Sequence, residues 1–353
     1  MPQPRAGAPI AVTMGDAAGI GPEIIARAFA EAPEHMRGCL VAGDVATIRR
    51  AAALVAQAGT GVPLPVAELT AVAQVARVPP RCIPVMQVVA PLADVAFGQL
   101  SAVAGQAAGD AVFWAARAAL RGELAALVTA PLNKEALAAA GAPYSLYPGH
   151  TELLQAVSAE HLGMPAAQVP VRMMLANDEL RTVLVSIHVP LREAIARVTV
   201  DNVLETLRIA HAALRRMLGR APRLAVAGLN PHAGEGGLFG PEEREIIAPA
   251  IRQARAEGIH ARGPYAPDTV FMRARGLAEF DLVVAMYHDQ GLIPVKYLGV
   301  EHGVNVTLGL PLVRTSPDHG TAFDIAGTGR ASPASLLAAV RLARQLAAPA
   351  QAA

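Results

Sequence analysis

The sequence is poor in aromatic residues and has almost no excess of charge of either sign. Only 4% of its 353 residues are aromatic, and its 30 basic and 29 acidic residues leave a formal net charge of +1. A base-stacking surface needs aromatic side chains, and binding to nucleic acid or an anionic membrane needs a basic excess. The composition therefore argues against nucleic acid and membrane partners and favours a small-molecule ligand.

Cysteines and long apolar runs are also scarce. Cys39 and Cys82 are too few for a disulfide framework, which favours a reducing cytoplasm. Although 53% of the residues are hydrophobic, alanine supplies much of that share, and no run of about 18 strongly apolar residues occurs. The first residues lack the apolar core of a signal peptide. We therefore expect a cytoplasmic protein without a transmembrane helix.

Strand-like and helix-like segments alternate along the chain, which is typical of an α/β fold. Apolar strand patterns cover residues 10–14, 39–42 and 124–129, and helical patterns cover 22–30 and 101–121. The length exceeds what one hydrophobic core usually supports, so we expect two domains.

Three histidines share one local setting, and this repetition is the most informative pattern present. His188, His232 and His288 each follow a short aliphatic run that predicts a buried strand. Each lies at or just past the carboxyl end of its strand, and ligands bind at that edge of open α/β sheets. A single such histidine is more often a hydrogen-bonded core or loop residue. The repetition favours a site for Zn²⁺ or a similar divalent ion.

Two glycine-containing turns are candidate ligand sites. The turn over residues 15–23 lacks the spacing of a Rossmann fingerprint, and a purely structural role fits it equally well. His150 and Thr151 stand at a predicted helix N-terminus, which favours an anion, although an ordinary helix cap also fits them.

The C-terminal third carries further polar candidates. Lys296 and Arg314, with Asn305 between them, flank apolar strands rather than helix faces, which indicates side chains in a cleft that bind phosphate or carboxylate. The small residues of the loop 318–333 allow a flat ligand to approach the backbone, and Asp324 is a candidate acceptor for a ribose or adenine group.

Asp268 and Asp289 are candidate partners of the histidines. Either carboxylate can orient a ligand histidine or act as a general base, and either can equally be a turn residue.

Taken together, these motifs resemble the 4-hydroxythreonine-4-phosphate dehydrogenase family of vitamin B6 biosynthesis, from Thr13 to Pro333. The resemblance rests on six segments in family order: residues 15–23, 149–152, 229–237, 285–291, 303–311 and 314–322. Two segments are also similar to isocitrate and isopropylmalate dehydrogenases.

The resemblance implies a two-domain fold like that of isocitrate and isopropylmalate dehydrogenases, with a cleft between the domains. By this analogy the first α/β domain comprises residues 1–135 and 305–353. The second comprises residues 136–304, with the metal histidines and the dimer interface.

The resemblance also implies roles for individual residues. The metal ligands (Zn²⁺, Mg²⁺ or Co²⁺) are His188, His232 and His288, one of them from the partner subunit of an obligate homodimer. The substrate-binding residues are His150, Thr151, Lys296, Asn305 and Arg314. NAD or NADP binds at His319, Gly320, Ala322 and Asp324, and the catalytic residues are Asp268 and Lys296.

The implied reaction is NAD(P)-dependent oxidation, with decarboxylation, of 4-(phosphooxy)-L-threonine to 3-amino-2-oxopropyl phosphate and CO₂. The segments 13–16, 129–137 and 147–150 are more similar to a paralogous branch that acts on 4-phospho-D-threonate or 4-phospho-D-erythronate in sugar-acid catabolism. The substrate therefore stays open between these two, because one polar contact can decide such a choice.

Three other functions compete with this one. A cis-dihydrodiol dehydrogenase would share the fold and metal site but would not need the full cationic cluster. A three-histidine metal hydrolase would not need the cofactor-like loop at 319–324. A non-catalytic metal-binding protein would need neither.

Overall fold

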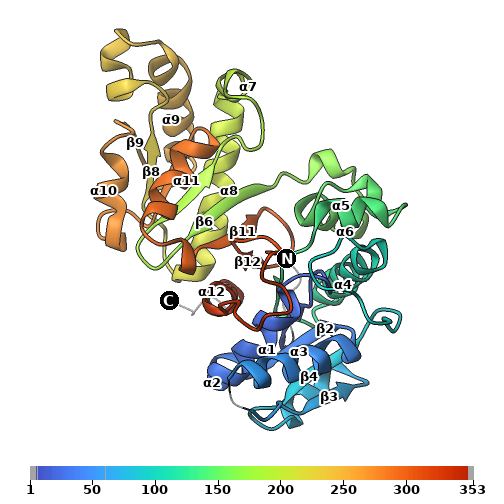
Figure 1. Ribbon diagram of the computed structural model, residues 1–353. Coiled ribbons are helices and arrows are strands. Elements are labelled where there is room, and N and C mark those ends of the chain that lie inside the picture. The colour runs from blue at the N-terminus through green and yellow to red at the C-terminus, as the bar shows by residue number, and fades with distance from the viewer. Residues whose placement is uncertain (1–4, 6, 60, 349–353) are drawn as a thin grey trace. The chain divides into compact units, whose positions relative to one another are not determined.

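The computed structural model describes residues 5, 7–59 and 61–348, and these form an α/β protein with two compact units, as the sequence predicts (Figure 1). Unit 1 comprises Met1–Pro170 and Leu310–Ala347, and unit 2 comprises Val171–Gly309. The expected boundary at residues 135/136 differs from this division. Helices α5 (Lys134–Ala139) and α6 (His150–Leu162) pack on α4 (Ala102–Leu120) and so belong to unit 1.

Unit 1 is built on a parallel sheet with the strand order β3-β4-β2-β1-β5-β12. Its strands are β1 (Ile10–Thr13), β2 (Cys39–Gly43), β3 (Val66–Leu69), β4 (Ile83–Gln87), β5 (Ala126–Thr129) and β12 (Arg314–Pro317). Its helices are α1 (Gly21–Glu31), α2 (Pro33–Met36), α3 (Val45–Ala58), α4 (Ala102–Leu120), α5 (Lys134–Ala139), α6 (His150–Leu162) and α12 (Ala334–Ala347). Helix α4 packs on β1, β2 and β5, and α12 packs on β1, β5 and β12.

Strands β1 and β5 are buried at every residue, as expected for central strands covered on both faces. The chain moves from β1 to β2 in one direction and later returns past β1 to form β5. This reversal places a topological switch point between β1 and β5, which is where open α/β sheets bind ligands.

Unit 2 has the strand order β11-β6-β7-β10-β8-β9, with β6 antiparallel to its neighbours β11 and β7. Its strands are β6 (Arg172–Ala176), β7 (Arg181–Leu184), β8 (Leu224–Ala227), β9 (Ala261–Tyr265), β10 (Leu282–Ala285) and β11 (Val304–Leu308). Its helices are α7 (Leu191–Ala196), α8 (Val200–Leu218), α9 (Ala248–Ala256), α10 (Val270–Ala274) and α11 (His288–Tyr297).

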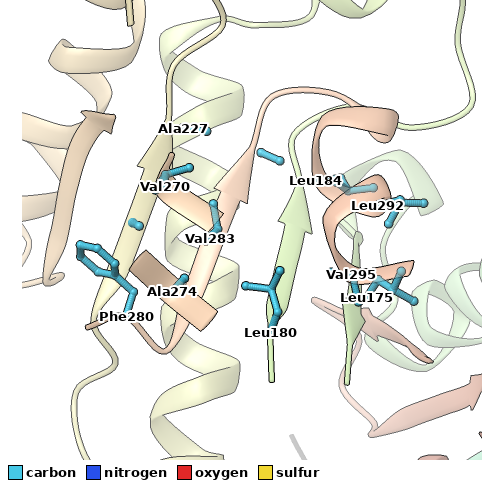
Figure 2. Packing of buried hydrophobic residues seen from close by; sticks show 12 residues of the cluster. Leu175, Leu180, Leu184, Ala227, Val270, Ala274, Phe280, Val283, Leu292 and Val295 are labelled. Carbon is cyan, nitrogen blue, oxygen red and sulfur yellow. The ribbon is translucent and has the colours of Figure 1, made fainter. Parts of the chain in front are cut away.

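The core of unit 2 joins its central strands to α10 and α11. Figure 2 shows Leu292 of α11 beside Leu184 of β7, and Val270 of α10 lies in the same buried cluster as Val283 of β10. Gly291 lets α11 pack closely on the strands, because a Cβ there would lie 2.9 Å from Ala285 Cβ and 2.4 Å from Leu184 Cδ2. The core therefore fixes α11, and with it His288, against the strands.

None of the helices in the described part of the chain combines the length and hydrophobicity that crossing a membrane requires.

Candidate active site

Three segments of unit 1 leave the sheet at the same edge, because β1, β5 and β12 are parallel neighbours. The glycine turn after β1 lies between the other two. The Asp16 N–H donates to the Pro131 carbonyl at 2.9 Å, and the Ile20 N–H donates to the Thr321 carbonyl at 3.0 Å. The glycine turn thus links the β5–α5 connection to the loop after β12, next to the switch point.

Arg314 is a buried cation at this edge. Its side chain is 5% exposed, and Nε and Nη2 donate to Thr129 Oγ1 at 3.0 and 2.7 Å. Burial lowers the pKa of its guanidinium to about 10, although the negative charge of Glu152 acts to raise this pKa. The group therefore stays protonated at neutral pH. A buried guanidinium at a ligand-binding edge suits a phosphate or carboxylate.

His150 and Thr151 begin helix α6, so their backbone N–H groups lie in its first turn. His150 Nε2 is shielded from solvent and has no hydrogen-bond partner among the residues that the structure describes. Burial lowers the pKa of this imidazole well below 6.5, and the charges of Arg314 and Lys134 lower it further. Unit 1 therefore brings together Arg314, a neutral His150 and a helix N-terminus, an arrangement that favours an anion.

The predicted cofactor loop has an open tip. His319, Gly320 and Asp324 are exposed, and a Cβ built on Gly320 would meet no atom within 4 Å. Ala322 has a φ of 42°, in the left-handed region that residues with a side chain rarely adopt. These features fit a site that a flat dinucleotide approaches closely.

In unit 2, two of the three histidines come together. Strands β7 and β10 are parallel neighbours, and the rings of His188 and His288, just past their ends, have centroids 5.5 Å apart. His288 Nδ1 lies 2.7 Å from Asp289 Oδ1, the contact by which a carboxylate orients a ligand histidine. His188 has a φ of 45°. The donor set and its orienting carboxylate fit a divalent ion.

His232 follows the adjacent parallel strand β8 but does not complete that pair. Its segment passes through left-handed residues from His232 to Gly236. Within the described ranges, no three His, Cys, Asp or Glu side chains are close enough together to hold a metal ion. Among the described residues, His232 is therefore not grouped with His188 and His288. The resemblance implied that one of the three ligands comes from the partner subunit, and a single chain leaves that prediction untested.

Lys296 lies on a helix, which corrects the expectation that it flanks a strand. Helix α11 begins at His288, at the histidine edge, and spans 10 residues, about 15 Å at 1.5 Å per residue. It returns along the strands to the β6–β7 turn, where Asn177 Nδ2 donates to the Val295 carbonyl at 3.0 Å. The exposed Lys296 follows Val295 and so lies toward the edge opposite the histidines.

Asn305 is placed toward that same opposite edge. It pairs with Leu175 in the antiparallel β11–β6 ladder, and Leu175 pairs in turn with Thr182, near the start of β7. Asp268, in contrast, is an exposed turn residue after β9, which runs parallel to β8. Asp268 therefore belongs to the histidine edge.

Several supporting residues were not singled out from the sequence. Gln290 ties the ends of two strands together, accepting from the Met286 N–H at 2.7 Å and donating to the Gly228 carbonyl at 2.8 Å. Glu243 accepts from the N–H groups of Leu229 and Asn230, both at 2.7 Å, and so holds the start of the His232 segment. Gln290 lies within the motif at 285–291, whereas the sequence gives no comparable signal for Glu243.

Comparison with known proteins shows which family this chain is similar to. The family model described as "Pyridoxal phosphate biosynthetic protein PdxA" matches residues 35–343. A 4-hydroxythreonine-4-phosphate dehydrogenase of Beijerinckia indica is 51% identical, over 97% of this chain and 96% of that protein. A D-threonate 4-phosphate dehydrogenase of Salmonella typhimurium is 46% identical, over 96% of this chain and 98% of that protein.

A solved structure shows the same similarity. The crystal structure of a 4-hydroxythreonine-4-phosphate dehydrogenase from Klebsiella pneumoniae has a TM-score of 0.83 and 42% sequence identity, and it covers 97% of this chain and 100% of that chain. The chain belongs to the PdxA family of pyridoxal phosphate biosynthetic proteins.

Proposed function

We propose that this protein is an NAD(P)- and divalent-metal-dependent dehydrogenase that oxidises and decarboxylates 4-(phosphooxy)-L-threonine, giving 3-amino-2-oxopropyl phosphate and CO₂. The observation that carries the proposal is the buried Arg314 beside a neutral His150 at the carboxyl edge of unit 1. This anion site lies on the same sheet edge as the loop 318–331.

The residues of the chain divide the work of the reaction. Arg314 and the first turn of α6, with His150 and Thr151, hold the phosphate, and this remote binding energy orients the reacting carbon. When bound, the metal supplies a Lewis acid for the substrate hydroxyl, and the nicotinamide supplies the electron acceptor. Asp268 takes the hydroxyl proton. The residues that would hold the metal are His188 and His288, with His232 from a second copy of the chain as the third ligand.

We further propose that the working protein is a homodimer in which each site draws on both copies. Within unit 2, the histidine pair lies at one edge of the sheet, whereas Lys296 and Asn305 lie toward the other. One substrate of this size cannot reach both edges of one sheet. A second copy of the chain therefore supplies Lys296 and Asn305 to the site that contains the histidine pair of the first copy.

A second candidate substrate is 4-phospho-D-threonate. The observation that favours it is the 46% identity to the Salmonella protein of that name, together with the motifs at 129–137 and 147–150. Both substrates present the same phosphate to Arg314, so the anion site does not choose between them.

A single assay tests the proposal. Purified protein is loaded with Zn²⁺, Mg²⁺ or Co²⁺, and formation of NADH or NADPH is followed with each substrate. We expect kcat/KM to be at least about tenfold higher for the phosphorylated amino acid, equivalent to about 1.4 kcal/mol. The reverse preference would assign the enzyme to sugar-acid catabolism. Absence of reduced cofactor with both substrates would overturn the proposal.

A further inference from the structure

Glu23 is a buried carboxylate that no step of the proposed reaction uses. It lies in the first turn of α1 and is 1% exposed. Its Oε1 accepts from the Gly327 N–H, and its Oε2 accepts from the Gly329 N–H at 3.0 Å. Both oxygens are thus committed to the backbone of a loop about 300 positions later in the chain.

Neighbouring groups reinforce this attachment. Arg27, on the same helix, donates to the carbonyls of Gly329 and Ala331 at 3.4 and 3.1 Å. The loop also fits closely against its surroundings: a Cβ on Gly327 would lie 2.5 Å from Phe97 Cδ2, and one on Gly329 would lie 2.7 Å from Ala58 Cβ. Moving this segment away from α1 would break the hydrogen bonds to Glu23 and Arg27.

The loop therefore has two different parts. Its base, residues 327–331, is held by Glu23 and Arg27. Its tip, residues 319–324, carries the exposed His319 and Asp324 that we assign to the cofactor. A carboxylate that accepts two backbone N–H groups makes charge-assisted hydrogen bonds, which are roughly twice as strong as neutral ones.

We propose that Glu23 is a positioning residue that sets the conformation of the cofactor loop, so that the tip is preorganised before NAD(P) binds. This inference rests on the proposed function, because it takes residues 319–324 to be the cofactor site. Preorganisation removes the cost of ordering the loop during binding. Its loss therefore weakens cofactor binding while leaving the phosphate site around Arg314 intact.

The test compares Glu23→Gln with wild type. Glutamine keeps the size of the side chain but offers one acceptor oxygen, and its NH₂ group faces a backbone donor. We expect the Kd for NADH or NADPH, measured by fluorescence titration, to rise at least about tenfold, with a matching rise in KM for the oxidised cofactor. The KM for the phosphorylated substrate should change less than about twofold. The matched control is Glu34→Gln, an exposed glutamate of α2, which should behave as wild type.

A second variant keeps the inference testable if Glu23→Gln does not fold. Arg27→Met removes the donors to the same loop base, and we expect a smaller rise in cofactor Kd, about threefold. Circular dichroism and Tm confirm that each variant is folded. The inference is overturned if folded Glu23→Gln binds NADH and NADPH like wild type, or if both KM values rise together. If the wild-type protein binds neither NADH nor NADPH, the proposed function itself is wrong.

Discussion

The two units hold their candidate functional groups in different ways. In unit 1 the key cation is buried, since Arg314 is 5% exposed, and its neighbours come from the same unit. In unit 2 the side chains of His188 and His232 are exposed, and both residues have a positive φ. Unit 1 thus holds a preformed candidate anion site, whereas unit 2 holds candidate metal ligands on surface turns with a positive φ.

This difference indicates what each unit requires to function. Burying a guanidinium costs free energy of desolvation, which hydrogen bonds and packing must offset. The groups around Arg314 are therefore already in place in the folded unit 1. An exposed imidazole loses little hydration on folding. Unit 2 can therefore hold an incomplete set of metal ligands, which groups from elsewhere complete. Substitutions in unit 1 should therefore affect a preformed site, whereas substitutions in unit 2 should affect a site that needs additional groups.

The largest expected effect is the loss of the buried cation. Arg314→Met should lower kcat/KM for the phosphorylated substrate by roughly 100- to 1,000-fold, about 3–4 kcal/mol, because a buried charge–charge contact is lost. Steady-state kinetics measure this change. Arg49→Met, at an exposed arginine of α3, is the control and should change little. A folded Arg314→Met enzyme within threefold of wild type would contradict the preformed anion site.

Loss of a histidine should act on metal binding. His188→Ala is expected to weaken Zn²⁺ affinity by at least about 100-fold, measured by competition with a chelator. Asp289→Asn removes only the carboxylate next to His288 Nδ1 and should weaken Zn²⁺ affinity about tenfold. Cofactor Kd should be unchanged in both variants. Equal zinc affinity in His188→Ala and wild type would show that the histidine pair does not hold the metal.

The smallest expected effect is a pH dependence of stability in unit 1. Burial lowers the pKa of folded His150 below 6.5, so on acidification the unfolded chain takes up a proton that the folded protein does not. The free energy of unfolding should therefore fall as the pH drops below about 6.5, by at most about 1.4 kcal/mol per pH unit.

Denaturant titrations across this pH range measure the slope. His150→Asn should reduce it, whereas His35→Asn, at an exposed histidine of α2, should leave it unchanged. An unchanged slope in His150→Asn would show that the imidazole is not buried in its neutral form.

Much of this arrangement could be predicted from the sequence. Apolar runs ended by polar residues indicate the strands before His188 and His288. Since these two strands are parallel neighbours, their carboxyl ends lie at the same edge of the sheet, and the two histidines meet there. The helical position of Lys296 is hard to predict, because Pro294, a usual helix breaker, lies within α11 and obscures the helical pattern. The role of Glu23 could not be predicted, because its partners Gly327 and Gly329 are distant in sequence and contribute only backbone groups.

The most direct test of the shared site is complementation between two inactive variants. His188→Ala removes a group at one edge of unit 2, and Lys296→Met removes a group toward the other edge. If one site uses these groups from different copies, mixing the two variants under conditions that exchange subunits forms heterodimers with one intact site, and NAD(P)H formation returns. If mixing restores no activity although heterodimers form, both groups serve the same site from a single chain, and the proposed sharing is wrong.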